Sequence, residues 1–157
     1  MRIGILSDTH DNLPKIEKAV KFFNSKKVDM VLHAGDFVAP FAVDRLMKFS
    51  CPWQGVFGNN DGEKKGLAEK SGGRIAEPPL RLELDGKKVT VVHDRMGIDF
   101  DKESADLIVF GHSHEAEVLR EGGRLFVNPG ECSGWLSGSS SVAIADSRTM
   151  DARIFRI

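Results

Sequence analysis

Seven side chains in this sequence are of the kinds that bind metal ions, and each lies just after a short apolar run. The runs are IGILS, MVLHAG, GVFG, VTVV and LIVFG. The residues that follow them are Asp8, His10, Asp36, Asn59, His93, His112 and His114. Four of the five histidines of the chain belong to this set. Such clustering of His and Asp at strand ends predicts one shared metal site rather than several unrelated loops.

The donor types and their number indicate which ions the site would take. Nitrogen and oxygen donors without thiolate favour Mn, Fe, Zn, Co or Ni over Ca or Cu(I). Seven ligands are too many for one tetrahedral zinc ion, but they suit two ions of five or six coordination that share a carboxylate. Two ions roughly 3.5–4 Å apart can hold a bridging hydroxide and clamp a phosphoryl group in line with it. The set therefore predicts two divalent transition-metal ions, Mn first and Ni, Co, Fe or Zn as alternatives, and phosphoester hydrolysis.

Two pairs within the set have a spacing of their own. Alternate residues of an extended chain point the same way, so Asp8-x-His10 and His112-x-His114 can each face one ion. Taken singly, an Asp at a strand end is more often a cap or a loop carboxylate, and an Asn more often a turn residue. The fifth histidine, His33, lies just inside a strand, which favours a place in the core or a supporting role in which it bonds to a ligand or a loop carbonyl.

The first half of the chain alternates predicted strands and helices that would position these residues. Strands are predicted at 2–6, 29–33 and 53–57. One helix is expected to begin after Asp11 or Asn12, with Pro14 in its first turn, and another to run from about 41 to 49. This β-α-β-α-β order implies parallel strands with right-handed crossovers. The carboxyl ends of such strands are where ligand sites are assembled.

The second half has a different pattern. Residues 80–84 and 88–92 flank Asp85-Gly86 and read as a β-hairpin. Further strands are expected at 107–110, 116–119, 124–127, 142–145 and 152–157, and a Gly-Ser loop at 137–141. The predicted fold class is therefore α/β with a substantial mixed or antiparallel part. The length favours a single domain over residues 1–157.

Composition argues against several classes of function. The chain has 22 basic and 23 acidic residues, a net charge of -1, and no run of five like charges. A nucleic-acid patch or a polybasic membrane anchor is not indicated. No apolar stretch approaches the ~20 residues that span a bilayer, and the N-terminus turns acidic before a signal-peptide core could form, so a cytoplasmic location is expected. Cys51 and Cys132 are expected to be reduced.

The motifs occur in an order that resembles a known superfamily. They are Asp8-x-His10, Gly35-Asp36, Gly58-Asn59-x-Asp61, His93 and Gly111-His112-x-His114. This series resembles the calcineurin-like metallophosphoesterases, and the segments ILSDTHDN and LHAGDF resemble the small YfcE/MJ0936-type phosphodiesterases of bacteria and archaea. The resemblance runs from residue 3 to about residue 130. It implies a four-layer sandwich of two mixed β-sheets flanked by helices.

The resemblance also implies roles for individual residues. It assigns Asp8, His10, Asp36 and His114 to a first metal ion, and Asp36, Asn59, His93 and His112 to a second. Asp36 would bridge the ions, and Asp61 would support the loop that holds Asn59. The implied activity is hydrolysis of a small-molecule or nucleotide-like phosphodiester by in-line attack of a metal-bridging hydroxide. Small members often self-associate, so the resemblance suggests a homodimer.

Three positions depart from the pattern of the superfamily. Asn60 stands where many larger members carry a His that protonates the leaving group or steadies the phosphate. An amide has no proton to give near neutral pH, so we predict a preference for activated or aryl diesters. Asp94 follows His93 and is expected to face solvent, although a raised pKa would let it protonate a leaving group. Glu131 replaces the Ser that relatives usually carry after Asn-Pro-Gly, with an effect that the sequence leaves open.

Several further residues are candidates for the rim of the site. They are Asp11-Asn12, Phe37 and Trp135-Leu136, for which helix capping or core packing is favoured over substrate contact. The alternative function is a non-catalytic scaffold, because the retromer complex contains a small subunit of this fold that is expected to lack part of the ligand set. A metallo-hydrolase of carbon esters or amides is disfavoured, because such enzymes usually open with His-x-His.

Overall fold

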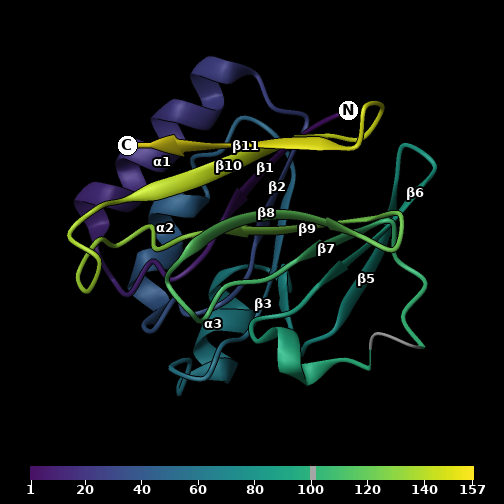
Figure 1. Cartoon of the computed structure of the whole chain (residues 1–157). Coiled ribbons are helices and arrows are strands. Elements are labelled where there is room, and N and C mark those ends of the chain that lie inside the picture. The colour runs from purple at the N-terminus through teal and green to yellow at the C-terminus, as the bar shows by residue number, and fades with distance from the viewer. Residues whose placement is uncertain (100–101) are drawn as a thin grey trace.

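The computed structural model describes residues 1–99 and 102–157 and contains two β-sheets packed face to face (Figure 1). The six-stranded sheet has the order β11-β10-β1-β2-β3-β4, and the five-stranded sheet has the order β5-β6-β7-β9-β8. The strands of the first are β1 Arg2–Leu6, β2 Met30–His33, β3 Trp53–Val56, β4 Ile75–Ala76, β10 Ser141–Asp146 and β11 Asp151–Arg156. Those of the second are β5 Leu80–Leu84, β6 Lys87–Val91, β7 Leu107–Val109, β8 Ala116–Glu121 and β9 Arg124–Pro129.

The helices are short apart from the first. They are α1 Leu13–Lys26, α2 Val43–Leu46, α3 Lys64–Lys70 and the 3-10 helices η1 Pro40–Ala42 and η2 Arg95–Gly97. The side chain of Asn12 accepts a hydrogen bond from the Lys15 amide, and Pro14 lies in the first turn of α1, as predicted. None of the helices in the described ranges has the length and apolar content needed to span a bilayer.

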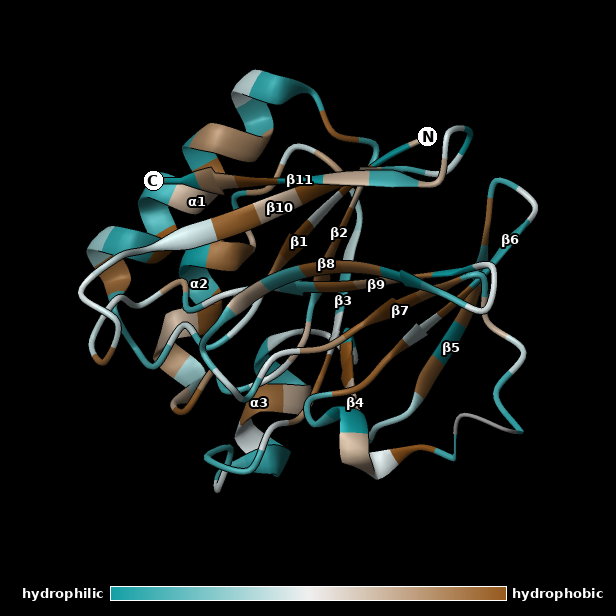
Figure 2. Cartoon of the chain, in the orientation of Figure 1, coloured by the Kyte–Doolittle hydropathy of each residue, from teal (hydrophilic) through white to brown (hydrophobic). Residues whose placement is uncertain are grey.

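Three apolar layers hold the sheets and helices together. Alternate strand residues point to opposite faces, so Ile3, Leu32, Val91 and Val127 meet between the two sheets. On the far face of the first sheet, α1, α2 and α3 bury apolar residues such as Phe23 and Leu46. The outer face of the second sheet buries a smaller cluster, Val92, Ala105, Ile108, Phe110 and Phe126. Apolar residues accordingly concentrate on the inner strands, and hydrophilic residues on exposed helix faces and turns (Figure 2).

Strand register aligns the ends that carry the polar residues. In the first sheet β1, β2 and β3 are parallel, with Leu6 beside His33 and His33 beside Gly55. In the second sheet β6, β7 and β9 are parallel, with Val91 beside Val109. The loops that leave the carboxyl ends of β1, β2, β3, β6 and β7 therefore open at one end of the sandwich.

The predicted mixed two-sheet fold is confirmed, with local differences. The helix expected at 41–49 is only η1 followed by α2, because its last residues close 3-10-type turns before Pro52, which cannot extend a helix. Neither α3 nor β4 was predicted from the sequence. Leu67 is the one buried residue of α3, and β4 has two residues, so neither has a periodic signal. Both cysteines are free thiols, as predicted.

Candidate metal centre

All seven predicted ligands lie in the loops at one end of the two sheets. Asp8 and His10 follow β1, Asp36 follows β2, Asn59 follows β3, His93 follows β6, and His112 and His114 follow β7. They form two donor groups that meet at Asp36.

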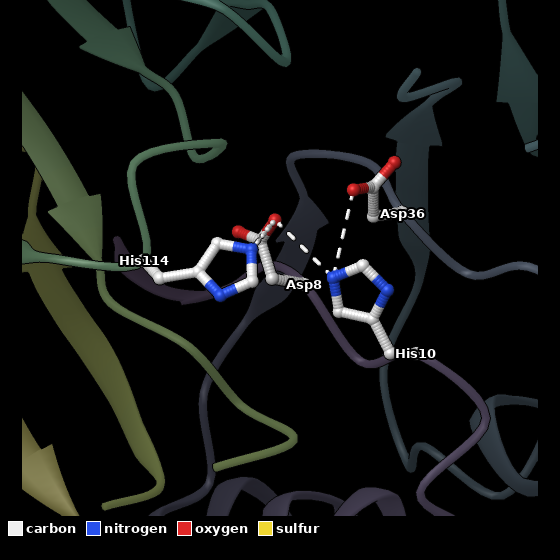
Figure 3. A group of neighbouring side chains, drawn as sticks. All are labelled: Asp8, His10, Asp36 and His114. Carbon is white, nitrogen blue, oxygen red and sulfur yellow. Dashed lines mark ion pairs between the residues drawn. The ribbon is translucent and has the colours of Figure 1, made fainter. Parts of the chain in front are cut away.

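The first donor group is Asp8, His10, Asp36 and His114 (Figure 3). One possible ligand atom from each of the four lies within 4.8 Å of the others. His10 Nε2 is 3.8 Å from Asp8 Oδ1 and 3.5 Å from Asp36 Oδ2. His114 Nε2 approaches Asp8 Oδ1 from the other side at 3.3 Å. Two carboxylates and two imidazoles thus point at one small volume.

The second donor group is Asp36, Asn59, His93 and His112. Asn59 Oδ1 lies 2.8 Å from His93 Nε2 and 2.9 Å from His112 Nδ1. His93 Nε2 is also 3.4 Å from Asp36 Oδ2, the same oxygen that faces His10. One oxygen of Asp36 therefore faces an imidazole of each group, which is the geometry a bridging carboxylate requires.

The first group fits a cation because its polar atoms are not satisfied by the protein. Asp8 Oδ1 and His10 Nε2 are buried and have no hydrogen-bond partner. A buried polar atom without a partner costs about 1–3 kcal/mol, and native proteins contain few of them. A cation between these two atoms would satisfy both at once.

The second group fits a cation through the tautomer of His93. Its Nδ1 lies 2.7 Å from the Ala34 carbonyl oxygen, which can only accept, so Nδ1 carries the hydrogen. In a neutral ring Nε2 then presents a lone pair to the oxygens of Asn59 and Asp36. Such an arrangement needs either a proton or a metal ion on Nε2.

The charges of Asp36 and Asp8 follow from their surroundings. Burial would raise the pKa of Asp36, but hydrogen bonds from His93 and Asn60 outweigh it and lower the pKa well below its usual value. Burial raises the pKa of Asp8, against opposing effects of the Ser7 hydroxyl and nearby histidines. Burial would lower the pKa of His93, but the Asp36 carboxylate raises it. A divalent cation would take over the charge compensation that protons supply here.

The backbone of the ligand loops corrects one prediction. Five of the candidate ligands have a backbone in the left-handed region, with positive φ values. They are Asp8 (53°), His10 (38°), Asp36 (61°), His112 (69°) and His114 (62°). They do not lie on an extended chain, so the alternation argument for the two x-spaced pairs was wrong. Asp8 and His10 share a group, whereas His112 and His114 belong to different groups. Such backbone costs about 1–3 kcal/mol per residue and typically persists at functional sites.

Two glycines make the close packing of these loops possible. A Cβ at Gly58 would overlap the Asp36 carboxylate and amide, and a Cβ at Gly111 would overlap the Ser7 hydroxyl and the Asp8 carboxylate. No other residue type fits these positions while the ligands keep their places.

Asp61 and Asn60 tie the loops after β2 and β3 together. Asp61 accepts hydrogen bonds from the amides of Asp36 at 3.1 Å, Gly58 at 2.7 Å and Val38 at 2.7 Å. Asn60 donates its backbone N–H and its side-chain Nδ2–H to the two oxygens of Asp36, at 2.8 and 2.7 Å. The side-chain amide of Asn60 therefore contacts a candidate ligand in this structure.

His33 contacts the loops of the site and belongs to neither donor group. Its Nδ1 accepts a hydrogen bond from the Gly35 amide at 3.1 Å, and its Nε2 lies 3.1 Å from the Thr9 hydroxyl. The ring stacks on Phe37 with a centroid distance of 3.7 Å. Complete burial lowers the pKa of His33 to about 3, so the ring is neutral. The expected supporting role holds, but the partners are an amide and a hydroxyl.

The predicted rim residues divide into two kinds. Asn12 caps α1 and Phe37 is buried in the core, as predicted. Trp135 and Leu136 are 65% and 80% exposed, so the prediction of core packing was wrong for them. Asp94 is half-exposed beside the second group, with Oδ2 3.9 Å from His112 Nε2.

A cleft of about 290 Å³ opens beside the second group. Asn59, His93 and His112 form its inner end, and Phe57, Pro78 and Val92 are its apolar residues. Asp94 and the ion pair between Lys64 and Glu77, 2.9 Å apart, also line it.

Glu131 is the residue of the site whose role sequence reasoning did not assign. It is buried, and its carboxylate accepts hydrogen bonds from Ser133 Oγ, the Leu136 amide, and the amide and hydroxyl of Ser137, at 2.7 to 3.2 Å. Its Oε1 lies 3.6 Å from His114 Nδ1. Burial alone would raise its pKa, but these hydrogen bonds lower the pKa to about 2. The only signal in the sequence was its departure from the usual Ser.

This low pKa predicts a pH dependence of stability. An acid whose pKa falls on folding stabilises the protein above its unfolded pKa, and this contribution is lost as the pH falls through the folded value. The relevant window for Glu131 runs from 4.5 down to about 2. In urea unfolding of the metal-free protein at about pH 6, the free energy of unfolding of wild type should exceed that of Glu131→Gln by a few kcal/mol. This difference in free energy should shrink at about pH 3. A difference that stays constant would contradict the assignment.

Comparison with known proteins gives a consistent result. Residues 1–150 match the model of the calcineurin-like phosphoesterase superfamily domain. The phosphodiesterase MJ0936 of Methanocaldococcus jannaschii is 35% identical to this chain over 161 residues, covering 98% of this chain and 97% of that protein.

Solved structures agree with this result. One described as a novel archaeal phosphodiesterase has 32% identity and a TM-score of 0.91, with 100% of both chains covered. Yfce, a phosphoesterase from E. coli, has a TM-score of 0.78 at 20% identity, covering 100% of this chain and 98% of the other, which supports the fold alone.

Proposed function

This chain belongs to the calcineurin-like phosphoesterase superfamily, and on that basis we propose that it is a metal-dependent phosphodiesterase whose site holds two divalent ions. The relative that is 35% identical over nearly the whole chain is itself named a phosphodiesterase. The observation that carries the two-ion proposal is the meeting of both donor groups at Asp36 Oδ2. We also propose that residues 1–157 form one domain.

The donor groups assign ligands to each ion. Asp8, His10, Asp36 and His114 would hold the first ion, and Asp36, Asn59, His93 and His112 the second. We propose Mn for both, with Ni, Co, Fe or Zn able to replace it. When bound, such ions supply a hydroxide for in-line attack at neutral pH and positive charge for the phosphoryl oxygens.

The protein residues keep the donors aimed before substrate arrives. Asn60 holds both oxygens of Asp36, and Asp61 fixes the loops on either side of it. The hydrogen bond from His93 Nδ1 to the Ala34 carbonyl points Nε2 at the oxygens of Asn59 and Asp36, which with His93 would hold the second ion. Because these contacts exist in the protein alone, little reorganisation remains for the reaction.

The cleft beside the second group suits one ester arm of the substrate. Phe57, Pro78 and Val92 offer apolar surface on which a planar aryl group can pack. Lys64, the one lysine or arginine among the described residues that line the cleft, is already paired with Glu77, and Asp94 adds negative charge. A second phosphate would therefore be disfavoured here, and we propose small diesters with an uncharged, apolar or aryl arm as substrates.

The alternative function, a non-catalytic scaffold of the same fold, is less well supported. A scaffold has no need to retain a complete donor set, yet all seven donors are present and converge in this chain. We therefore propose that the protein is a catalyst. A metal-restoration assay distinguishes the two functions.

The assay starts from protein stripped of metal and adds Mn, Ni, Co, Zn or Mg singly. Hydrolysis of an aryl phosphodiester should rise by ~10²-fold or more with at least one ion and exceed that of the matching monoester. His112→Ala should abolish the restoration, whereas Lys102→Ala, at an exposed position, should leave it unchanged. No restoration by any ion, or full activity of His112→Ala, would refute the proposed function.

A further inference from the structure

The loop between β9 and β10 wraps around a buried carboxylate. We call residues 131–139 the clamp loop; Glu131 is its first residue and is 1% exposed. Four donors of the loop itself surround the carboxylate, namely Ser133 Oγ, the Leu136 amide, and the amide and hydroxyl of Ser137. These bonds fix the course of the loop around Glu131.

The same carboxylate faces a ring of the first donor group. Glu131 Oε1 is 3.6 Å from His114 Nδ1, and that nitrogen is buried without a hydrogen-bond partner. On the opposite side of the ring, Nε2 faces Asp8 Oδ1 at 3.3 Å. A metal-ligating imidazole usually donates its other N–H to a carboxylate or carbonyl. A shift of a few tenths of an ångström would make this contact a hydrogen bond.

Within residues 1–99 and 102–157, Glu131 has no other partner of opposite charge. Among the residues that the structure describes, His114 is its only ion-pair partner within 4.0 Å. A buried carboxylate costs several kcal/mol unless it is paired or well hydrogen-bonded. The hydrogen bonds of the loop offset part of this free-energy cost. The positive charge of a metal ion bound to His114 would offset more of it.

The clamp loop also pairs with the backbone that carries Asp8 and His10. The amides of Cys132 and Ser133 donate to the carbonyls of Ser7 and Asp8, each at 3.0 Å. The indole N–H of Trp135 donates to the His10 carbonyl at 3.2 Å. The loop thereby holds two ligands whose backbone is left-handed and would otherwise relax.

We propose that Glu131 is a positioning residue for the first metal ion: it orients His114 through Nδ1 and, through the clamp loop, holds the segment of Asp8 and His10. This inference rests on the proposed function, because it assumes that the first donor group binds a divalent ion. It explains why a buried acid stands after Asn-Pro-Gly, since a Ser side chain is too short to span from the loop donors to His114.

Metal binding, rather than activity alone, tests the inference. The test compares three metal-free proteins: wild type, Glu131→Gln and Ser137→Ala. Each is titrated with Co²⁺, and binding is measured by calorimetry and by the visible absorption of the bound ion. Glu131→Gln should weaken one of two sites by 10–100-fold and change the absorption of that site, while the other site keeps its affinity. Ser137→Ala removes loop bonds but leaves the carboxylate beside His114, so it should lower the melting temperature with less than about a threefold change in affinity.

Specific results would overturn the inference. If Glu131→Gln melts earlier but binds both ions as wild type does, Glu131 acts on the loop only. If both variants weaken binding equally, the contact with His114 contributes nothing. If Glu131→Gln does not fold, Glu131→Asp, which keeps the charge but withdraws it from His114, decides by the same titration: one weakened site supports the inference and unchanged sites overturn it. Wild type that binds no ion would refute the proposed function itself together with this inference.

Discussion

Asp36→Asn is expected to lower kcat/KM for an aryl phosphodiester by about 10³-fold or more. Charge stabilisation by bound ions is worth several kcal/mol, and each 1.36 kcal/mol is a factor of ten. The reason lies in the position of Asp36 Oδ2, which is 3.5 Å from His10 and 3.4 Å from His93 and so belongs to both donor groups. Loss of its negative charge should therefore weaken the binding of both ions at once.

The number of bound ions separates this effect from that of other ligands. Calorimetric titration of Asp36→Asn should show weakened binding at both sites, whereas His112→Ala should retain the first site. Asp44→Asn is the matched control, because Asp44 is half-exposed on α2, pairs with Lys70 and lies outside both donor groups. It should keep activity within about twofold of wild type. A rate for Asp36→Asn above a tenth of wild type would show that Asp36 is not shared by two ions.

The sequence allowed much of the fold to be predicted, because strands and turns have local signals. Alternation around Asp85-Gly86 predicts the hairpin of β5 and β6 within one residue, and the apolar run at 2–6 predicts β1. Helix α3 has one buried residue and β4 has two residues in all, so their positions depend on packing that no short window of sequence contains.

The site shows the same division between local and long-range information. Residue type and position after a strand sufficed to select seven side chains, and the structure brings all seven together. The partition of His112 and His114 between two groups could not be predicted from their spacing, because it depends on left-handed backbone that the loop adopts only when packed. The sequence singled out Glu131 but could not assign its role, for a related reason: its partner His114 lies in the loop after a different strand.

Asn60 leads to the second large prediction, which concerns the leaving group. Its backbone and side-chain N–H groups both bond to Asp36, so it helps to hold a candidate ligand. It has no titratable proton, and among the described residues at the two donor groups every imidazole is a candidate ligand. General acid catalysis typically contributes ~10²–10⁴-fold, most for poor leaving groups such as alkoxides. Wild type should therefore hydrolyse aryl diesters far faster than alkyl diesters of similar affinity.

Asn60→His should narrow this difference by about 10²-fold, because an imidazolium can protonate a departing alkoxide. The aryl-to-alkyl rate ratio is the quantity to measure. A loss of metal binding lowers the rates of one variant on both substrates by the same factor, so it leaves this ratio unchanged. The general acid must be protonated to act, so alkyl diester hydrolysis by Asn60→His should fall as the pH rises above about 6.5, the usual pKa of histidine. Asn60→Gln keeps the amide without an acid and should retain the wild-type ratio. Equal rates of wild type on matched aryl and alkyl diesters would mean that another group already protonates the leaving oxygen, and Asp94, 3.9 Å from His112, would then be the first residue to replace.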